Sequence, residues 1–380
     1  MIPAAYAVLD LEAAAHNVEK VRGYAPNARI MAVIKANGYG HGLLRIAGAL
    51  QNADAFAVAR VDEGIRLRKA GIEKRIVVLE GFTCSEELEE LLHFQLDAVV
   101  HSFVQVEVFE QRTELGQIAI WLKLDTGMNR LGFKANEFNA VYQRLNQCSI
   151  IGQPINLMTH LANADDKQDL MTDKQISLFN DTLAALVPKL KSTNERSIAN
   201  SAGILAWPAA LTDWVRPGVM LYGISPFAES TGGQLGLKPI MGLYSRLIAV
   251  KQIVTGDKVG YSGSWVCEKP TTLGVVAIGY GDGYPRYAKT GTPVLVNGQR
   301  VPLIGRVSMD MITVDLAGQP HAKPGDPVTL WGDGLAVEEI ALCADTIPYT
   351  LVCGVTQRVK IVEKTALQEE VLLSKKAKST

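Results

Sequence analysis

The first two thirds of the chain repeat one pattern, in which a short apolar run is followed by a segment with helical spacing of apolar residues. A run at residues 30–34, for example, precedes helical spacing over residues 43–50, and residues 85–92 form a capped amphipathic pattern. This alternation predicts parallel strands joined by helices. The candidate strands lie at residues 30–34, 56–58, 75–79, 97–100, 118–124, 155–159, near Ser197 and at 214–216.

Eight candidate strands fit a closed barrel. The segment 1–236 is close to the length of about 250 residues that is typical of an eight-stranded α/β barrel. An open doubly wound sheet is the alternative, and it is less favoured because no Gly-x-Gly-x-x-Gly follows the first strand. We therefore predict the α/β class, with an N-terminal eight-stranded (TIM-type) α/β barrel over residues 1–236.

The remaining segment has a different pattern, of short alternating β-type runs separated by turn residues such as Asn297-Gly298. A chain of 380 residues exceeds what a single core usually supports. We therefore predict a second, all-β domain over residues 237–380, with a frayed tail from about residue 365. Its candidate strands lie at residues 246–253, 272–278, 293–296, 300–304, 312–316 and 327–331.

The composition excludes several classes of partner. The formal net charge is −1, so no excess charge points to nucleic acid or to a membrane surface. The five cysteines are scattered without a Cys-x-x-Cys pair, which indicates reduced thiols, and no metal site is predicted. The N-terminus lacks the features of a signal peptide, and no stretch approaches the roughly 20 apolar residues that span a bilayer. We expect a cytoplasmic protein that acts on a small molecule.

Lys35 points most directly to chemistry. It follows the first candidate strand and precedes Gly38, Gly40 and Gly42. The C-terminal ends of the strands carry the active site in α/β barrels, and partial burial there would lower the lysine pKa and favour Schiff-base chemistry. From the residues alone, a surface lysine before a flexible turn explains the pattern equally well.

The segment Lys35-Ala36-Asn37-Gly38-Tyr39-Gly40-His41-Gly42 resembles the attachment motif for pyridoxal 5'-phosphate (PLP) of the bacterial alanine racemases. The resemblance reaches Val359 and lies closest to the enzymes of Gram-negative bacteria. It implies a PLP-dependent enzyme that interconverts L-alanine and D-alanine, with Lys35 holding the cofactor as a Schiff base. Further matching segments follow in the family's order at residues 123–132, 158–162, 199–203, 215–218, 260–263, 279–286 and 305–310.

The resemblance also implies which residues bind the cofactor. Tyr39, Ser201, Tyr349 and the backbone at Gly218 would hold the phosphate. Arg216, which read alone only begins an Arg-Pro-Gly turn, would donate to the pyridine nitrogen, and its permanent charge would keep that nitrogen unprotonated. The ring is then a weaker electron sink, which disfavours transamination. The complete set is Lys35, Tyr39, His160, Asn200, Ser201, Arg216, Gly218 and Tyr349.

For the substrate, the resemblance implies that Arg130 binds the carboxylate, for which a guanidinium is well shaped. A surface ion pair is the alternative explanation of Arg130. Lys123, as a carbamate, would orient Arg130, and Met309 would contact the substrate. The supporting residues implied around the same pocket and its entrance are Lys123, Tyr280, Asp310, Arg286 and Arg306.

Racemisation removes a proton from one face of Cα and delivers one to the other face, so two opposed bases suit it. The resemblance implies Lys35 and Tyr261 as these bases, with Tyr261 contributed by the partner subunit of a homodimer and His160 bridging Tyr261 and Arg216. Taken alone, Tyr261 is a turn aromatic and His160 a structural histidine. Asn37 and Ser262 replace the alanine and glycine that are usual in the family, which affects no proposed catalytic group.

Several functions stay open at this point. A broad-specificity or serine racemase would share these motifs, because the pocket size cannot be read from them. A PLP decarboxylase of the same architecture is a more distant alternative, and a PLP carrier protein would not need a second base. The usual role of the family is to supply D-alanine for peptidoglycan.

Overall fold

The computed structural model describes residues 3–112, 116–186 and 194–365, and the chain divides into two compact units. One unit is Ala15–Leu221, and the other combines Met1–Ala14 with Tyr222–Thr380. The sequence placed the division at residue 236 and the N-terminus in the barrel. The units differ from that expectation because β1 (Tyr6–Leu9) pairs with strands of the C-terminal unit.

The first unit is a closed barrel of eight parallel strands, as expected. Each strand pairs with the next one in the chain, and β9 pairs with β2 to close the ring. The strands are β2 (Arg29–Val33), β3 (Ala55–Val58), β4 (Arg75–Val78), β5 (Asp97–Val100), β6 (Ile120–Lys123), β7 (Asn156–Met158), β8 (Arg196–Ser197) and β9 (Trp214–Val215).

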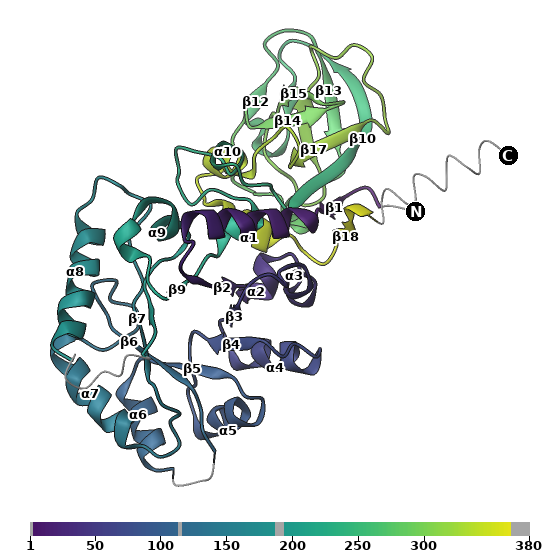
Figure 1. Ribbon diagram of the computed structural model, residues 1–380. Coiled ribbons are helices and arrows are strands. Elements are labelled where there is room, and N and C mark those ends of the chain that lie inside the picture. The colour runs from purple at the N-terminus through teal and green to yellow at the C-terminus, as the bar shows by residue number, and fades with distance from the viewer. Residues whose placement is uncertain (1–2, 113–115, 187–193, 366–380) are drawn as a thin grey trace. The chain divides into compact units, whose positions relative to one another are not determined.

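Helices cover the outside of these strands (Figure 1). Every residue of β3, β5 and β6 is buried, because a barrel strand is covered by helices on one face and by the barrel interior on the other. The helices of this unit are α1 (Glu12–Tyr24), α3 (Leu43–Ala49), α4 (Val61–Lys69), α5 (Ser85–His93), α6 (Phe103–Glu110), α7 (Ala135–Gln147) and α8 (Met171–Ala184). Two shorter segments, α2 (Lys35–Tyr39) and α9 (Ser201–Ala206), follow the C-terminal ends of β2 and β8.

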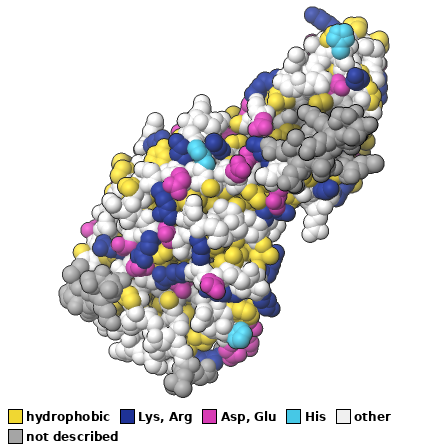
Figure 2. Space-filling model, turned by 45° about the vertical axis from the view of Figure 1, so that its right-hand side comes forward, with side chains coloured by type: hydrophobic (Ala, Val, Ile, Leu, Met, Phe, Trp, Pro, Cys, Tyr) yellow, Lys and Arg dark blue, Asp and Glu magenta, His cyan; other side chains and the backbone are white. Residues whose placement is uncertain are grey.

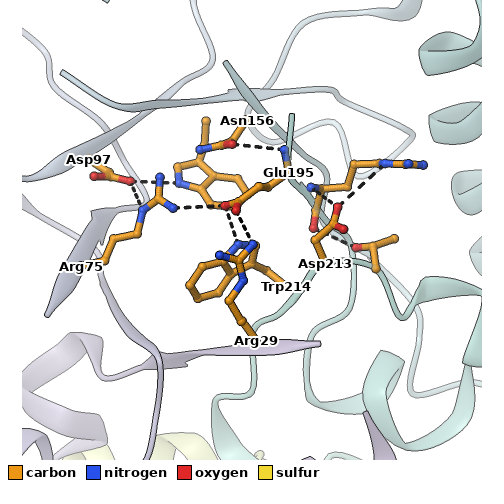
Figure 3. Close-up of polar contacts among 10 residues, drawn as sticks. Arg29, Arg75, Asp97, Asn156, Glu195, Asp213 and Trp214 are labelled. Atoms are coloured by element: carbon orange, nitrogen blue, oxygen red, sulfur yellow. Dashed lines mark hydrogen bonds and ion pairs between the residues drawn. The ribbon is translucent and has the colours of Figure 1, made fainter. Parts of the chain in front are cut away.

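A polar network closes the N-terminal end of the barrel, and Glu195 lies at its centre (Figure 3). The Glu195 carboxylate accepts hydrogen bonds from Arg29, from Arg75 Nη1 at 3.2 Å and from Trp214 Nε1 at 2.7 Å. Arg75 also pairs with Asp97 through Nε at 2.5 Å. Because these residues come from β2, β4, β5, β9 and the segment before β8, the network ties together strands that are distant in the sequence.

Two tryptophans fill the barrel above this network. Trp121 and Trp214 are buried and meet edge to face, with ring centroids 6.3 Å apart. The guanidinium of Arg29 lies 4.4 Å from the centre of the Trp214 ring, and that of Arg75 lies 5.4 Å from the centre of the Trp121 ring. Such cation–π contacts add to the ion pairs, so this end of the barrel is a stability element.

Replacing Glu195 by glutamine should therefore destabilise the barrel, since an amide cannot accept from two arginines and a tryptophan at once. We expect a loss of about 2 kcal/mol in the free energy of unfolding, below the full cost of breaking a buried pair because Glu195 is partly exposed. Urea denaturation followed by tryptophan fluorescence measures it. The control is Glu110→Gln, which breaks an exposed pair with Arg144. Equal losses in the two variants would contradict the prediction.

The second unit is rich in β-strands, and its main sheet has eight strands. The long strand β10 (Met241–Ile253) pairs with β1, β13 and β17, so it joins the N-terminal strand to the rest of the sheet. The other strands are β11 (Lys258–Val259), β12 (Trp265–Val266), β13 (Thr271–Val276), β14 (Pro293–Val296), β15 (Gln299–Pro302), β16 (Ile312–Asp315), β17 (Pro327–Trp331) and β18 (Lys360–Glu363).

Two helices, α10 (Val337–Cys343) and α11 (Pro348–Gly354), also belong to this unit, for which the sequence predicted strands alone. The expected frayed tail lies almost wholly outside the described residues. No helix in the described part of the chain is both long and apolar enough to cross a membrane. On the face drawn in Figure 2, basic and acidic side chains are interspersed in small groups, in keeping with the low net charge.

Candidate active site

The turn that carries Lys35 has an unusual backbone. Four consecutive residues after Lys35 have left-handed φ angles, of 53° at Ala36, 54° at Asn37, 62° at Gly38 and 50° at Tyr39. Each non-glycine residue in this conformation costs about 1–2 kcal/mol, and asparagine tolerates it better than alanine does. Conformational strain of this kind is concentrated at functional sites. The tight turn at the end of β2 fixes the backbone positions of Lys35 and Tyr39, from which their side chains extend.

Tyr39, Ser201 and Gly218 come together at the C-terminal end of the barrel. A Cβ atom on Gly218 would lie only 2.5 Å from the Tyr39 hydroxyl, so a side chain at position 218 would displace it. The Ser201 hydroxyl accepts from the Gly218 amide at 2.9 Å and from the Met220 amide at 3.4 Å. Because the Ser201 oxygen accepts from these amides, its own proton is directed elsewhere, and this proton and the Tyr39 hydroxyl are donors that suit a phosphate.

Asn200 organises the start of α9, immediately before Ser201. Its side-chain oxygen accepts from the Gly203 amide at 2.9 Å, and its side-chain nitrogen donates to the Leu161 carbonyl at 3.3 Å. Both ends of the amide are therefore engaged within the barrel unit. Asn200 fixes the position of Ser201 relative to the loop after β7.

Arg216 is buried and lies across the ends of β7 and β8. Its Nη1 donates to the Ser197 hydroxyl at 2.5 Å, and its Nη2 donates to the carbonyls of Thr159 and, at 3.1 Å, Ile198. Burial lowers the Arg216 pKa to about 10, so the guanidinium stays charged at neutral pH. Among the described residues no carboxylate forms an ion pair with it.

His160 lies two residues after the end of β7 and contacts Arg216. The His160 Nδ1 lies 3.4 Å from Arg216 Nη2. Burial lowers the His160 pKa well below its usual value, and the charges of Arg216, Lys123, Arg130 and Lys35 act in the same direction. The imidazole is therefore neutral at pH 7. Because arginine can only donate, Nδ1 accepts and the ring proton is on Nε2.

Lys123 is a buried lysine at the end of β6, on the same end of the barrel as His160 and Arg216. Burial, together with the positive charges of Arg216, Arg130 and Lys35, lowers its pKa to about 7. Near pH 7 the Lys123 amine is therefore about half neutral. Neutral amines react with electrophiles, which ammonium groups cannot do.

Arg130 lies on the exposed loop after β6 and forms no ion pair within the described residues. The neighbouring carboxylate, Asp125, is engaged elsewhere: it pairs with Lys134 at 2.5 Å and accepts from the amides of Gly127 and Asn129. These contacts shape the loop that carries Arg130. They leave the guanidinium available for an anionic ligand.

A second group of predicted residues gathers on one part of the β-rich unit. The segments around Gly260, Tyr280 and Met309 lie side by side, since the amides of Tyr280 and Gly281 donate to the carbonyls of Ser308 and Met309 and a Cβ on Gly260 would approach the Arg306 amide to 3.3 Å. Tyr261 is 64% exposed, and Tyr280 and Met309 are also exposed. Asp310 pairs with Arg358 at 2.7 Å, which holds this surface together.

Arg286 and Arg306 line an open pocket of about 510 Å³ beside this group. The Arg286 guanidinium lies 6.0 Å from the centre of the Tyr280 ring, and the pocket also contains the hydroxyls of Ser264 and Thr290. Tyr349, the remaining predicted residue, lies on α11 and is half-buried.

Three buried polar residues behind the barrel mouth were not predicted. Gln175 on α8 donates to the Thr126 hydroxyl and to the His160 carbonyl, both at 3.1 Å. The Thr126 and Thr159 hydroxyls are 2.8 Å apart, and Thr159 also donates to the Leu124 carbonyl. These bonds fix the loops after β6 and β7. The sequence signal for Gln175 was its place on the same face of α8 as Ile176, Phe179 and Leu183, where a buried polar side chain needs partners.

Comparison with known proteins gives concordant matches along the chain. Family models for the N-terminal and C-terminal domains of alanine racemase match residues 9–226 and 240–363. An alanine racemase of Nitrosococcus oceani is 50% identical over 353 residues, which cover 93% of this chain and 97% of the relative. The biosynthetic alanine racemase of Escherichia coli is 48% identical, covering 94% and 98%. The crystal structure of biosynthetic alanine racemase from Pseudomonas aeruginosa has a TM-score of 0.90 at 42% identity, covering 96% and 100%.

Proposed function

The chain belongs to the alanine racemase family, and on this premise we propose that it interconverts L-alanine and D-alanine with PLP as cofactor. The observation that carries the proposal is the set of cations at the barrel mouth. Lys123, Arg130 and Arg216 form no ion pair with a carboxylate in the described part of the chain, although the charges of the two arginines lower the Lys123 pKa. A cluster of cations without acidic partners favours the binding of anionic ligands.

The residues at the mouth fit PLP in two places. The Tyr39 and Ser201 hydroxyls beside Gly218 form a cradle in which a Cβ would clash, and we infer that they hold the phosphate together with Tyr349. Arg216 has an Nε–H and a second Nη1–H with no acceptor among the described residues, which suits a pyridine nitrogen. Asn200 supports the cradle, and Lys35 would bind the cofactor covalently.

When bound, PLP supplies an electron sink that makes the Cα proton of an amino acid acidic enough to remove. Lys35 then takes or gives this proton on one face of the substrate. The neutral form of the lysine amine is the one that accepts a proton.

Tyr261 would serve the opposite face, from a second subunit. Its exposed side chain stands clear of the β-rich unit, as a group that enters another chain's site must. His160 would contact it through the Nε2–H, which is left over because Nδ1 accepts from Arg216. A donor there stabilises the tyrosine anion that acts as a base.

The substrate carboxylate would pair with Arg130, whose guanidinium has no acidic partner among the described residues. Met309, Tyr280 and Asp310 would border the substrate from the second subunit. The pocket with Arg286 and Arg306 would form the entrance, and its two positive charges favour an incoming carboxylate.

Incubation of the purified protein with L-alanine tests the proposal. We expect D-alanine to appear until the enantiomers are equal, together with the absorbance of lysine-bound PLP. Release of CO2 would identify a decarboxylase, and faster turnover of serine than of alanine would identify a serine racemase. A yellow protein without turnover would indicate a carrier. Any of these three results would overturn the assignment.

Lys123 gives a separate prediction, that its amine reacts with CO2 to form a carbamate. The pKa of about 7 supplies the neutral amine, and an anion is favoured next to Arg130 and Arg216. A ¹³C NMR spectrum in ¹³C-bicarbonate should show one carbamate signal that the Lys123→Met variant lacks. Identical spectra of the two proteins would remove the carbamate.

The physiological role is a further part of the proposal. Relatives from Escherichia coli and Shigella boydii carry the word biosynthetic in their names, which favours a supply of D-alanine for peptidoglycan by a cytoplasmic homodimer. Depletion of the protein should then make growth depend on added D-alanine. Unchanged growth in a cell without a second racemase would contradict this role.

A further inference from the structure

Ser197 is a buried serine in β8, in register with Met158 of β7 and Trp214 of β9. Its hydroxyl donates to the Trp214 carbonyl at 2.9 Å and accepts from Arg216 Nη1 at 2.5 Å. A hydroxyl has one proton to donate, and here the Trp214 carbonyl takes it. The lone pairs of Ser197 are therefore directed to the guanidinium.

The contacts of the Arg216 guanidinium are divided unequally between its two terminal nitrogens. Nη2 donates to the carbonyls of Thr159 and Ile198 and contacts His160. In the described part of the chain, Ser197 is the one acceptor for Nη1. Contacts at Nη2 alone hold one end of the planar group, whereas a bond at each terminal nitrogen also fixes the direction of the remaining Nε–H and Nη1–H.

We propose that Ser197 is a positioning residue for the cofactor: it fixes Arg216 so that Nε–H and the second Nη1–H are directed to the ring nitrogen of PLP. This inference rests on the proposed function. A hydrogen bond from a correctly placed guanidinium keeps the ring nitrogen unprotonated. Without Ser197 the group turns, water reaches the nitrogen, and the protonated ring directs more turnovers to transamination, in which alanine leaves as pyruvate and its amino group stays on the cofactor.

The test compares Ser197→Ala with Ser245→Ala. Ser245 is also a buried strand serine whose hydroxyl donates to a backbone carbonyl, that of Ala277 at 3.0 Å, and it lies in the other unit, away from Arg216 in the sequence and the sheet. Both variants lose the hydrogen bond that the serine donates to a backbone carbonyl, and Ser197→Ala also loses the bond from Arg216. We therefore expect a decrease of a few degrees in melting temperature in both, larger in Ser197→Ala. If Ser197 had a structural role only, Ser197→Ala would change the melting temperature and nothing else.

Two further measurements separate positioning from packing. Titration of the apoprotein with PLP should give a dissociation constant about tenfold higher in Ser197→Ala and unchanged in Ser245→Ala, as expected for a lost charge-assisted bond. The pyruvate formed per racemisation event should rise about tenfold in Ser197→Ala alone. If Ser197→Ala equals Ser245→Ala in both measurements, Ser197 only packs the barrel. If the unmodified protein neither binds PLP nor racemises alanine, the proposed function itself fails.

Discussion

Replacing Lys35 by alanine is expected to reduce alanine racemisation by about 10⁴-fold, because under the proposed mechanism the variant loses both the covalent attachment of the cofactor and one of two bases. The loss should appear in kcat for both enantiomers, since the proton is taken on one face and delivered on the other in either direction. A coupled assay for D-alanine, and one for L-alanine, measure it. Melting temperature should change little, because Lys35 is partly exposed at the end of β2.

Borohydride reduction locates the cofactor directly. Reduction fixes PLP on the lysine that carries it, and peptide mapping should find the label on Lys35 in the unmodified protein and on no lysine in Lys35→Ala. Lys69→Ala, which changes an exposed lysine of the same barrel, should keep both the label and the activity. A label on Lys123 in the unmodified protein would assign the cofactor to the wrong strand end and sink the prediction.

The barrel could be predicted from the sequence because its signal is local. Most of the eight strands are short apolar runs with buried side chains, so hydrophobicity marks them, whereas β8 (Arg196–Ser197) has an exposed arginine and a buried serine. β1 and β18 were missed for the opposite reason: each is an ordinary short run, and only pairing across more than 200 residues of chain, Tyr6 with Tyr244 and Tyr6 with Lys360, makes it part of the sheet. The same pairing explains why the N-terminus groups with the C-terminal unit.

The part of the site that could be predicted from the sequence is the part that lies directly after the barrel strands. Lys35, Lys123, His160 and Arg216 all follow apolar runs, and the parallel barrel brings such positions to one end. Their residue types indicated the chemistry, and the family resemblance supplied the roles, which stay proposals.

Other parts of the site depend on side-chain directions and backbone angles, which the spacing of residues in the sequence does not predict. Arg216 folds back toward Ser197 and Thr159, and this follows from strand register and side-chain rotation. The left-handed turn at Ala36–Tyr39 is likewise visible only as backbone angles, although Asn37-Gly38 was a signal for it. Both features shape the donors that a cofactor would meet.

Replacing Tyr261 by phenylalanine should slow net racemisation by about 10²–10⁴-fold, the contribution of one positioned base. Net rates must fall equally in both directions, because the enantiomers have equal energies and their equilibrium constant is one. Exchange of the Cα proton with solvent separates the bases. In D2O, the enantiomer whose proton is taken by Lys35 should still exchange in Tyr261→Phe, and the other enantiomer should exchange far more slowly. NMR of the Cα proton measures both rates.

Mixed dimers then test whether Tyr261 acts in a second subunit. A Lys35→Ala subunit paired with a Tyr261→Phe subunit has one site with both defects and one with none, so random mixing of the inactive variants should restore about a quarter of the normal activity. If Tyr261 served its own chain, each site would keep one defect and mixing would restore nothing. Tyr24→Phe, which changes an exposed tyrosine of α1, is the control and should leave both exchange rates unchanged. Equal, small losses of exchange for the two enantiomers in Tyr261→Phe would show that another group is the second base.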